Sequence, residues 1–588
     1  MVVSHVVLVV NKNNNFGLAK DAELLKGAWI SWGRAHGQHG LKVSVLDPRE
    51  PPIQCDVVVF LEVPHPVWFS WARVRVLMLN EEWWLDAWNG YVRDFDLVLC
   101  KTRDAAVRLA SRVNSAKVGA LPEQFLIHWK GTVPSAEFAA ALGPLKAKER
   151  AWTWFLGGSV NKIAAAKQLL PLWPVSNLPL KVYAAAEFLS ETERAALPAH
   201  VQVFVGDLSP KQHRAAAAKT LGHVNCSAAE SFGYAAAESV AAGAFMLLNR
   251  INTYSEYYGE CGQAAWLDLS GSVEEIQEAL VSADARLRAV EERVVKADME
   301  RFYQGMDRRW KESFEAFADT VAVKVEGAAA LGQMPPILKV DDCPPVSVVI
   351  LTHNRPNFVK NFFLQLMSTD FLWNRLEITV VDDTPSEKNY GPMILGFRDR
   401  IAPMELNYIP LDKKHTIGEK RNIGVKYAKH DIIAFFDDDD NYPLTSLRRR
   451  VAWLTKTGER TKAVACTAIA CYDLQTGVSF MNVPPYNLPL EERVSEATLT
   501  FYKSFWEERP FPATDSAEGE GFLKGRADAV LELPPQQIIV AFSHGKNASA
   551  RIIPQKGIKP SCAWGFSKEE LIFYHRLAGV QVEEAGRK

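Results

Sequence analysis

Four consecutive carboxylates, Asp437 to Asp440, directly follow the apolar run 432–436. An apolar run of strand length that ends abruptly in acids indicates a buried strand that delivers carboxylates to the edge of a sheet. Because four adjacent like charges repel one another, we expect a positive group beside them. Carboxylate oxygens are hard ligands that favour Mg²⁺ or Mn²⁺ over softer metals. The run therefore predicts a divalent-cation site at this sheet edge.

Two earlier strand-like runs also end in polar residues. The run 346–351 is followed by Thr352 to Arg355, and the run 378–381 is followed by Asp382 and Asp383. In an open parallel sheet, ligands bind beyond the carboxyl ends of the strands, so these groups should converge on one crevice. A solvated loop would explain the Asp437 run alone, but it would not explain polar residues at successive strand ends.

Four motifs occur in this part of the chain in a fixed order: VSVVILTHNRP (346–356), VVDDT (380–384), GEKRNIGVKYA (418–428) and IIAFFDDDD (432–440). Together they resemble the signature of inverting glycosyltransferase family 2. The resemblance implies an A-type nucleotide-sugar transferase fold with a single mixed sheet. It also implies transfer from a nucleotide sugar with a divalent metal, Mn²⁺ or Mg²⁺, and without an organic cofactor.

The resemblance assigns residues to the donor. Those expected around the nucleotide are Thr352, Asn354, Arg355, Asp382, Asp383, Lys420, Arg421, Asp437 and Asp438. Asp382 or Asp383 would bind the base, commonly uracil, so a UDP-sugar is the expected donor. Asp437 to Asp440 cover the DxD position of the family, and Asp439 is the expected metal ligand. In an extended segment Asp437 shares its face, and we expect Asp437 to be a second ligand.

Two further groups complete the expected C-terminal site. Direct displacement at an anomeric carbon needs a base for the acceptor hydroxyl, and a carboxylate with a raised pKa is the usual solution. The family carries this base near a helix start, where this chain has Glu518 and Glu520, and either could serve. His544 resembles the late histidine that several A-fold transferases bring to the metal, although a loop histidine is as often structural.

The N-terminal half contains a second pair of acids, Glu230 and Glu238, in SAAESFGYAAAESVAAGA (227–244). Gly233 would allow a tight turn into a helix whose amino end attracts phosphate. This segment resembles the E-x7-E signature of retaining glycosyltransferase family 4, which has a B-type fold of two doubly wound lobes. The resemblance extends to the turn containing Gly17 and to the loop before Lys162.

The family 4 resemblance implies that Glu238 binds ribose, Glu230 the donor sugar and Lys162 the diphosphate. Phe232 and Gly233 would shape the pocket. The family usually has an arginine as well as a lysine at the phosphate site, and only Lys162 is evident here. Because a missing cation would weaken transition-state stabilisation, this half could be slow or could be a binding platform.

Strand-like runs alternate with helical segments from residue 6 to about 320, which predicts parallel sheets. We predict a first lobe at 1–125, a second lobe at 126–325 with long terminal helices, and a linker at 326–345. The family 2-like domain would occupy 346–553, and a C-terminal extension would occupy 554–588. The fold class is therefore α/β, with twin doubly wound lobes followed by one mixed-sheet nucleotide-sugar domain.

Composition limits the setting in which the protein works. Eight scattered cysteines without a CxxC pair are typical of a reducing compartment, and no apolar run has the length of a membrane span. We therefore expect a cytoplasmic protein. The formal net charge of -2 provides no basic field for nucleic acid, which makes such a partner possible but not favoured.

These observations predict a bifunctional glycosyltransferase that acts on a glycan or glycoconjugate acceptor, with a retaining N-terminal module and an inverting, metal-dependent C-terminal module. One alternative acceptor is a hydroxylated nucleobase in DNA. Another alternative is that only the C-terminal module is catalytic and that the N-terminal half is a carbohydrate- or nucleotide-binding platform.

Overall fold

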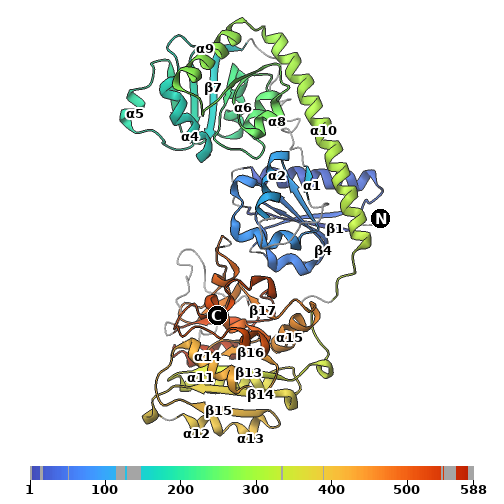
Figure 1. Cartoon of the computed structure of the whole chain (residues 1–588), viewed down its shortest axis with the longest axis vertical. Coiled ribbons are helices and arrows are strands. Elements are labelled where there is room, and N and C mark those ends of the chain that lie inside the picture. Colours follow the sequence, from blue (N-terminus) through green and yellow to red (C-terminus); the bar gives the residue numbers. More distant parts are fainter. Residues whose placement is uncertain are drawn as a thin grey trace, which may run out of the picture. The chain divides into compact units, whose positions relative to one another are not determined.

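The computed structural model describes residues 3–12, 17–48, 50, 52–113, 126–128, 148–332, 336–388, 390–485, 487–544, 547 and 564–580. The chain forms two compact units. The first comprises residues 1–48, 55–64 and 73–328, and the second comprises 49–54, 65–72 and 329–588. Figure 1 shows the elements of each unit.

The first unit contains two six-stranded sheets, which we call the first and second lobes. The first-lobe sheet has the order β2-β1-β3-β4-β5-β6, with parallel β1–β2, β1–β3, β4–β5 and β5–β6 pairs. Its strands are β1 (His5–Val9), β2 (Lys42–Leu46), β3 (Cys55–Leu61), β4 (Ala72–Leu79), β5 (Leu97–Cys100) and β6 (Leu126–His128). Since β6 pairs with β5, the first-lobe sheet extends beyond the expected boundary at residue 125.

The second-lobe sheet has the order β12-β11-β10-β7-β8-β9, and every pair in it is parallel. Its strands are β7 (Glu149–Gly157), β8 (Leu180–Ala184), β9 (Val201–Val205), β10 (Thr220–Asn225), β11 (Phe245–Asn249) and β12 (Ala264–Leu267). The predicted twin doubly wound lobes are thus confirmed.

The α-helices described in this unit are α1 (Leu18–Ala35), α2 (Arg103–Val113), α4 (Val160–Leu169), α5 (Glu191–Ala195), α6 (Pro210–Lys219), α7 (Tyr234–Ala241), α8 (Asn252–Tyr258), α9 (Val273–Ala289) and α10 (Glu292–Gly327). The long helix α10 does not belong to the second lobe alone. Val295 and Met299 pack in the core of the second lobe, whereas Phe314, Phe317 and Val321 pack against the first-lobe sheet.

The second unit is built on a seven-stranded mixed sheet with the order β15-β14-β13-β16-β20-β17-β21. Its strands are β13 (Val346–Thr352), β14 (Leu376–Asp382), β15 (Glu405–Pro410), β16 (Ile432–Asp437), β17 (Ala463–Cys466), β20 (Thr500–Tyr502) and β21 (Val530–Leu533). β20 runs antiparallel to both β16 and β17, whereas the other paired strands run parallel. The predicted single mixed sheet is confirmed.

A smaller sheet and several helices complete this unit. The small sheet has the order β19-β18-β22 and contains β18 (Ile469–Asp473), β19 (Val478–Asn482) and β22 (Val540–Ser543). The α-helices described here are α11 (Pro356–Ser368), α12 (Gly391–Leu395), α13 (Arg398–Ile401), α14 (Ile417–Tyr427), α15 (Ser446–Lys456), α16 (Lys503–Glu508), α17 (Glu518–Leu523) and α18 (Lys568–Leu577). Across the residues that the structure describes, no helix is long and apolar enough to cross a membrane.

Both faces of the mixed sheet are buried, which explains why its central strands are continuous apolar runs. Alternate residues point to opposite faces. Val348 and Ile350 of β13 join one apolar cluster, whereas Val349 joins the cluster on the other face with Ile433 and Phe435 of β16. The polar side chains at the carboxyl ends of β13, β14 and β16 are therefore carried by a rigid, fully packed core.

Helix α14 approaches this sheet closely through a glycine. A Cβ atom added at Gly424 would lie 2.4 Å from Cγ1 of Val349 and 3.3 Å from Cγ2 of Val381. Both contacts involve β-branched side chains of central strands, which cannot move aside easily. Gly424 thus sets the distance between the sheet and the helix that carries Lys420 and Arg421.

Gly424→Ala should therefore lower the free energy of unfolding of the second unit by about 1–3 kcal/mol, because it overpacks a close helix–sheet contact. Denaturant unfolding measures the change. Lys426→Ala is the matched control, because Lys426 is exposed on the same helix and its change should be within about 0.5 kcal/mol. Equal stability of the two variants would contradict the packing argument.

Candidate active sites

The acid cluster begins where β16 ends. Asp437 is the last residue of the strand, and the chain turns at Asp438, Asp439 and Asp440. One carboxylate oxygen each of Asp437, Asp439 and Asp440 lies within 4.8 Å of the others. The expected extended segment, with Asp437 and Asp439 alone on one face, is wrong, because the turn also brings Asp440 to the group.

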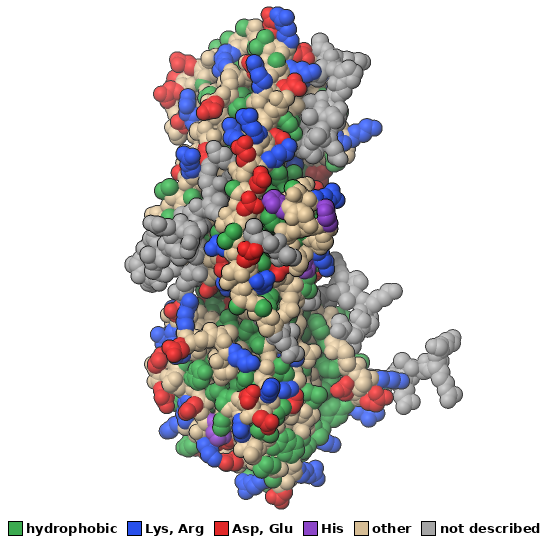
Figure 2. All heavy atoms as spheres, turned by 90° about the vertical axis from the view of Figure 1, so that its right-hand side faces the viewer, with side chains coloured by type: hydrophobic (Ala, Val, Ile, Leu, Met, Phe, Trp, Pro, Cys, Tyr) green, Lys and Arg blue, Asp and Glu red, His purple; other side chains and the backbone are tan. Residues whose placement is uncertain are grey.

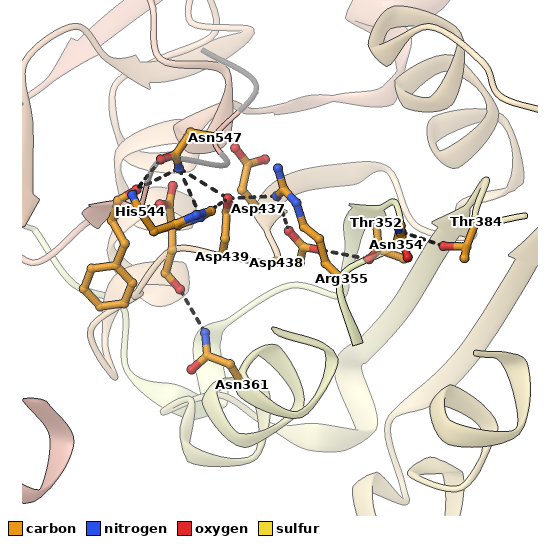
Figure 3. A network of polar contacts seen from close by, with 12 residues as sticks. Thr352, Asn354, Arg355, Asn361, Thr384, Asp437, Asp438, Asp439, His544 and Asn547 are labelled. Carbon is orange, nitrogen blue, oxygen red and sulfur yellow. Dashed lines mark hydrogen bonds and ion pairs between the residues drawn. The ribbon is translucent and has the colours of Figure 1, made fainter. Parts of the chain in front are cut away.

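Asp439 lies at the centre of a polar network (Figure 3). Arg355 donates from Nη1 to Oδ2 of Asp439 at 2.8 Å and to Oδ1 of Asp438 at 2.9 Å. Nε2 of His544 lies 2.9 Å from Oδ2 of Asp439, and Nδ2 of Asn547 donates to the same oxygen at 3.4 Å. The structure thus brings His544 to Asp439 and places Arg355 on the acids. Asn547 was not predicted, because nothing near it in the sequence singles it out.

Asp438 faces the protein interior. It is buried, and Oγ1 of Thr352 donates to its Oδ2 at 2.8 Å. Burial and the neighbouring Asp439 raise the pKa of Asp438 to about 7, while Arg355 acts in the opposite direction. Thr352 and Asp438 therefore form a buried link between the ends of β13 and β16.

The second acidic strand end is paired with a cation. Asp383 accepts from Nζ of Lys420 at 2.9 Å and from the backbone N–H of His415 at 3.0 Å. Burial raises the pKa of Asp383, but these hydrogen bonds outweigh it and leave the pKa below its usual value. Asp382 accepts from the hydroxyl of Tyr408 at 3.0 Å. Both acids lie at the carboxyl end of β14, as predicted, and each is already engaged by protein groups.

Asn354 adopts a strained backbone conformation just beyond the carboxyl end of β13. Its φ is 50°, in the left-handed region that few residues other than glycine and asparagine adopt. Its N–H donates to Oγ1 of Thr384 at 2.8 Å, and its Oδ1 accepts from Lys388 and Tyr390 at 3.0 and 3.2 Å. These contacts hold Asn354 at the exposed edge of the site.

The two candidate bases have different surroundings. Glu518 is buried at the first turn of α17, and its Oε1 accepts from Nε of Arg421 at 2.9 Å. Nη2 of Arg421 lies 4.0 Å from Oδ1 of Asp437. Glu520 is only partly buried, and no contact of its side chain with Arg421 or the acid cluster is observed within the described chain. Arg421 therefore connects Glu518, but not Glu520, with the acid cluster.

This donor set suits a hard divalent cation. Asp437, Asp439 and Asp440 provide three carboxylate oxygens near one another, and His544 lies against Asp439. Oxygen-rich sites of this kind favour Mg²⁺ or Mn²⁺, and an imidazole ligand shifts the preference towards Mn²⁺. The residues present thus fit the expected metal, with Asp440 in addition to the predicted Asp437, Asp439 and His544.

In the first unit, the structure brings Lys162 and Glu230 together. Nζ of Lys162 lies 3.8 Å from Oε1 of Glu230. The backbone N–H of Ala228 donates to the carbonyl of Asn161 at 3.1 Å, which joins the two loops that carry this pair. Ser159 caps α4 by accepting from the N–H of Lys162. The predicted phosphate and sugar residues therefore share one site.

The other predicted acid, Glu238, accepts from Nζ of Lys20 in the first lobe at 2.8 Å. Gly233 has a φ of 82°, which confirms the tight turn before α7, and a Cβ atom there would lie 2.5 Å from Cε1 of Tyr254. Phe232 is buried beside the turn. Gly17, with a φ of 104°, precedes α1, while residues 13–16 of the same predicted loop lie outside the described residues.

A cavity of about 380 Å³ lies between the two lobes of the first unit. Its lining residues are Glu81, Arg108, Arg112, Ala228, Ala229, Glu230, Ile251, Asn252 and Thr253. Nη2 of Arg108 lies 2.8 Å from Oε2 of Glu81, and Nη1 of Arg112 lies 3.5 Å from Oε1. The sequence reasoning did not predict this arginine pair, because α2 is an ordinary charged helix in the sequence and only its fold places the pair opposite Glu230.

Comparison with known families bears directly on the second unit. Residues 347–493 match the family model described as Glycosyl transferase family 2. This part of the second unit is therefore similar to the glycosyltransferases of family 2. The matched residues include β13, β14 and β16 and therefore the acid cluster, and we call the part of the second unit that surrounds this seven-stranded sheet, including Glu518 and His544, the family 2 domain. Curated protein sequences give no match to the chain.

Three of the solved structures that match the chain show low sequence identity to it. A mannosyltransferase, PcManGT from Pyrobaculum calidifontis in complex with GDP-Man and Mn²⁺, has a TM-score of 0.27 and 17% identity over 34% of this chain and 56% of its own. S. aureus TarS 1-349 in complex with UDP-GlcNAc has a TM-score of 0.26 and 18% identity over 41% of this chain and 68% of its own.

A third structure, described as "Trehalose-6-phosphate from E. coli bound with UDP-2-fluoro glucose", has a TM-score of 0.40 and 9% identity over 54% of this chain and 99% of its own. This chain spans little more than half the length of the mannosyltransferase. Because the TM-scores are below 0.5, we derive no residue role from these three proteins.

Asp439→Asn should weaken Mn²⁺ binding to the intact chain by about tenfold or more, because it removes a charged oxygen at the centre of the cluster. Isothermal titration calorimetry measures this affinity. Asp431→Asn is the matched control, since Asp431 is exposed just before β16 and its loss should leave the affinity unchanged. Unchanged Mn²⁺ affinity in Asp439→Asn would contradict the assignment.

Proposed function

We propose that the family 2 domain transfers a sugar from a nucleotide sugar, with UDP-sugars as the expected donors, to a hydroxyl of a glycan acceptor with inversion. One observation carries the proposal: Arg421 lies between Glu518, at 2.9 Å, and Asp437, at 4.0 Å. A buried carboxylate that could act as a base therefore lies beside the acids that suit a divalent cation. Such a cation would in turn bind the donor diphosphate. Inverting transfer needs both groups in one site.

In this mechanism Glu518 accepts the proton of the acceptor hydroxyl while the acceptor oxygen attacks the anomeric carbon. The bond from that carbon to the diphosphate oxygen breaks on the opposite face, and its electron pair leaves with the nucleoside diphosphate. A divalent cation held by Asp437, Asp439, Asp440 and His544 would offset charge on the leaving diphosphate. Arg355 contacts the same acids and would reach the donor phosphates.

Glu518 is the stronger candidate for the base. Its carboxylate is buried, held in place by Arg421 and close to the acid cluster. Glu520, which lies two residues after Glu518 in α17, is partly exposed. A base must lie within hydrogen-bond reach of the acceptor hydroxyl in the donor site, and the position of Glu518 satisfies this requirement better.

We further propose that the first unit is a second, retaining active site that needs no metal. Lys162 would contact the donor diphosphate, Glu230 the sugar and Glu238 the ribose. The cavity beside Glu230 supports a catalytic role, because its size is within the range of small-molecule sites and its far wall carries Arg108 and Arg112. A donor-binding platform alone would not need a second polar wall facing the donor sugar.

A DNA acceptor is a weaker candidate. Basic and acidic side chains are intermixed on the face of the molecule that Figure 2 shows, and the formal net charge is -2. Binding to a phosphate backbone usually requires clustered Lys and Arg side chains. We therefore favour a glycan or glycoconjugate as the acceptor of both sites.

The test uses the intact chain with a panel of nucleotide sugars, with Mn²⁺ or with EDTA, and measures release of nucleoside diphosphate. Glu518→Gln should reduce the Mn²⁺-dependent activity about 100-fold or more, because it removes the general base. Lys162→Gln should reduce the EDTA-resistant activity about 100-fold, because it removes a cation from the leaving phosphate.

Each variant serves as the control for the other. Glu518→Gln should leave the EDTA-resistant activity at the wild-type level, and Lys162→Gln should leave the Mn²⁺-dependent activity at the wild-type level. If Lys162→Gln changes neither activity, the first unit is a binding platform. If all nucleoside diphosphate release survives in both variants, the proposed sites are wrong. Nuclear magnetic resonance of the product anomers then distinguishes inversion from retention.

A further inference from the structure

A second, half-buried acid, Glu496, lies against the helix start that carries Glu518. Glu496 begins a short 3-10 helix (Glu496–Thr498) that leads directly into β20. Its Oε1 accepts from the backbone N–H of Gly519 at 3.2 Å. Because Gly519 directly follows Glu518, this bond fixes the Glu496 carboxylate beside the backbone of Glu518. The two acids are far apart in the sequence, and only the fold brings them together.

The segment that carries Glu496 is tied to the acid cluster. The hydroxyl of Tyr442 accepts from the N–H of Asp437 at 2.8 Å and donates to the carbonyl of Ala497 at 3.2 Å. Oγ1 of Thr498, which is fully buried, accepts from the N–H of Cys466 at 2.8 Å. Glu496 therefore occupies a fixed position at the carboxyl end of β16, in the family 2 site.

The absence of a side chain at position 519 permits this contact. A Cβ atom on Gly519 would lie 2.6 Å from Oε1 and 2.9 Å from Cγ of Glu496. Any larger residue would push the carboxylate of Glu496 away from the start of α17. A glycine at this point thus allows the two acids to approach each other.

If Glu496 and Glu518 were both ionised, the charges around these two acids would not balance. Arg421 is the cation that pairs with Glu518, and it also lies 4.0 Å from Asp437. Glu518, Asp437 and Glu496 raise the pKa of Arg421 although burial acts in the opposite direction, so Arg421 stays charged. Burial and the nearby Glu518 raise the pKa of Glu496 to about 7, and Arg421 offsets part of this effect. Glu496 therefore takes up a proton near neutral pH.

We propose that Glu496 and Glu518 act together as the proton acceptor of the family 2 site, with Glu518 meeting the acceptor hydroxyl and Glu496 as a positioning residue that shares the proton. This inference rests on the function proposed above. The acceptor O–H bond breaks, its proton passes to the carboxylate pair, and the oxygen forms the new bond to the anomeric carbon. Arg421 keeps the pair from carrying two uncompensated charges.

The proton shared by Glu496 and Glu518 determines the direction in which kcat/KM changes with pH. Below about pH 7 the pair already holds one proton, which makes it a weaker acceptor for the proton of the acceptor hydroxyl, whereas above this pH it no longer holds that proton. The wild-type kcat/KM should therefore rise as the pH increases through about 7. A general base is also most effective when its pKa lies near the pH at which the enzyme acts.

Glu496→Gln tests the proposal, because its amide oxygen can still accept from Gly519 while it cannot take up a proton. We expect reduced but measurable Mn²⁺-dependent transfer, about tenfold below wild type, and loss of the inflection of kcat/KM near neutral pH. Glu492→Gln, an exposed glutamate upstream of Glu496, is the matched control and should keep the wild-type profile. Gly519→Ala, which displaces the Glu496 carboxylate, should change the profile as Glu496→Gln does.

Two results would overturn the proposal. An unchanged pH profile in Glu496→Gln would show that Glu496 is only structural. Complete inactivity, equal to that of Glu518→Gln, would show that Glu496 itself is the base.

An infrared titration of the carboxyl groups separates failure of this inference from failure of the proposed function, because it requires no turnover. The wild-type minus Glu496→Gln difference should contain a carboxyl group that ionises near pH 7. Its absence would contradict proton sharing even if transfer is observed. Its presence without any Mn²⁺-dependent transfer would contradict the function alone.

Discussion

The family 2 domain depends on one electrostatic constraint, namely that carboxylates gathered at the ends of buried strands must be neutralised. Protein cations do this in the described structure: Arg355 lies on Asp438 and Asp439, and Lys420 lies on Asp383. Unpaired buried charges would be strongly destabilising. A metal and a diphosphate entering the proposed site would therefore find charges already placed, and the cations that balance the acids could turn to the phosphates.

The same principle applies in the first unit. Lys162 lies near Glu230, and Lys20 of the first lobe pairs with Glu238 of the second lobe. A bound nucleotide sugar would offer phosphate oxygens to the lysines and hydroxyl groups to the glutamates. Both halves of the chain thus contain carboxylates paired with lysine or arginine side chains. A bound nucleotide sugar could separate the members of these pairs, although the folds of the two halves differ.

Much of this organisation could be predicted from the sequence. Buried parallel strands have apolar runs and abrupt polar ends, so β13, β14 and β16 and the acids beyond them were evident. The turn at Gly233 was predicted because glycine tolerates its φ of 82°. These features could be predicted because each of them is determined by a short stretch of sequence.

The remaining features depend on contacts between distant segments. The turn that brings Asp440 to Asp437 and Asp439, the position of Arg355 on the acids and the contact of Glu496 with Gly519 all arise from packing. The antiparallel strand β20, which follows the segment of Glu496, has only three residues and is too short for a periodic pattern to identify it. The cavity between the lobes likewise exists only because α2 and the Glu230 loop face each other.

The most direct test of the electrostatic account is a crystal of the intact chain grown with Mn²⁺ and UDP, examined by anomalous scattering. We predict a manganese peak among the carboxylates of Asp437, Asp439 and Asp440 and next to His544, with the diphosphate bound to it and Arg355 turned towards the phosphate oxygens. A manganese peak elsewhere, or a diphosphate bound with the acid cluster still paired only to Arg355, would contradict it.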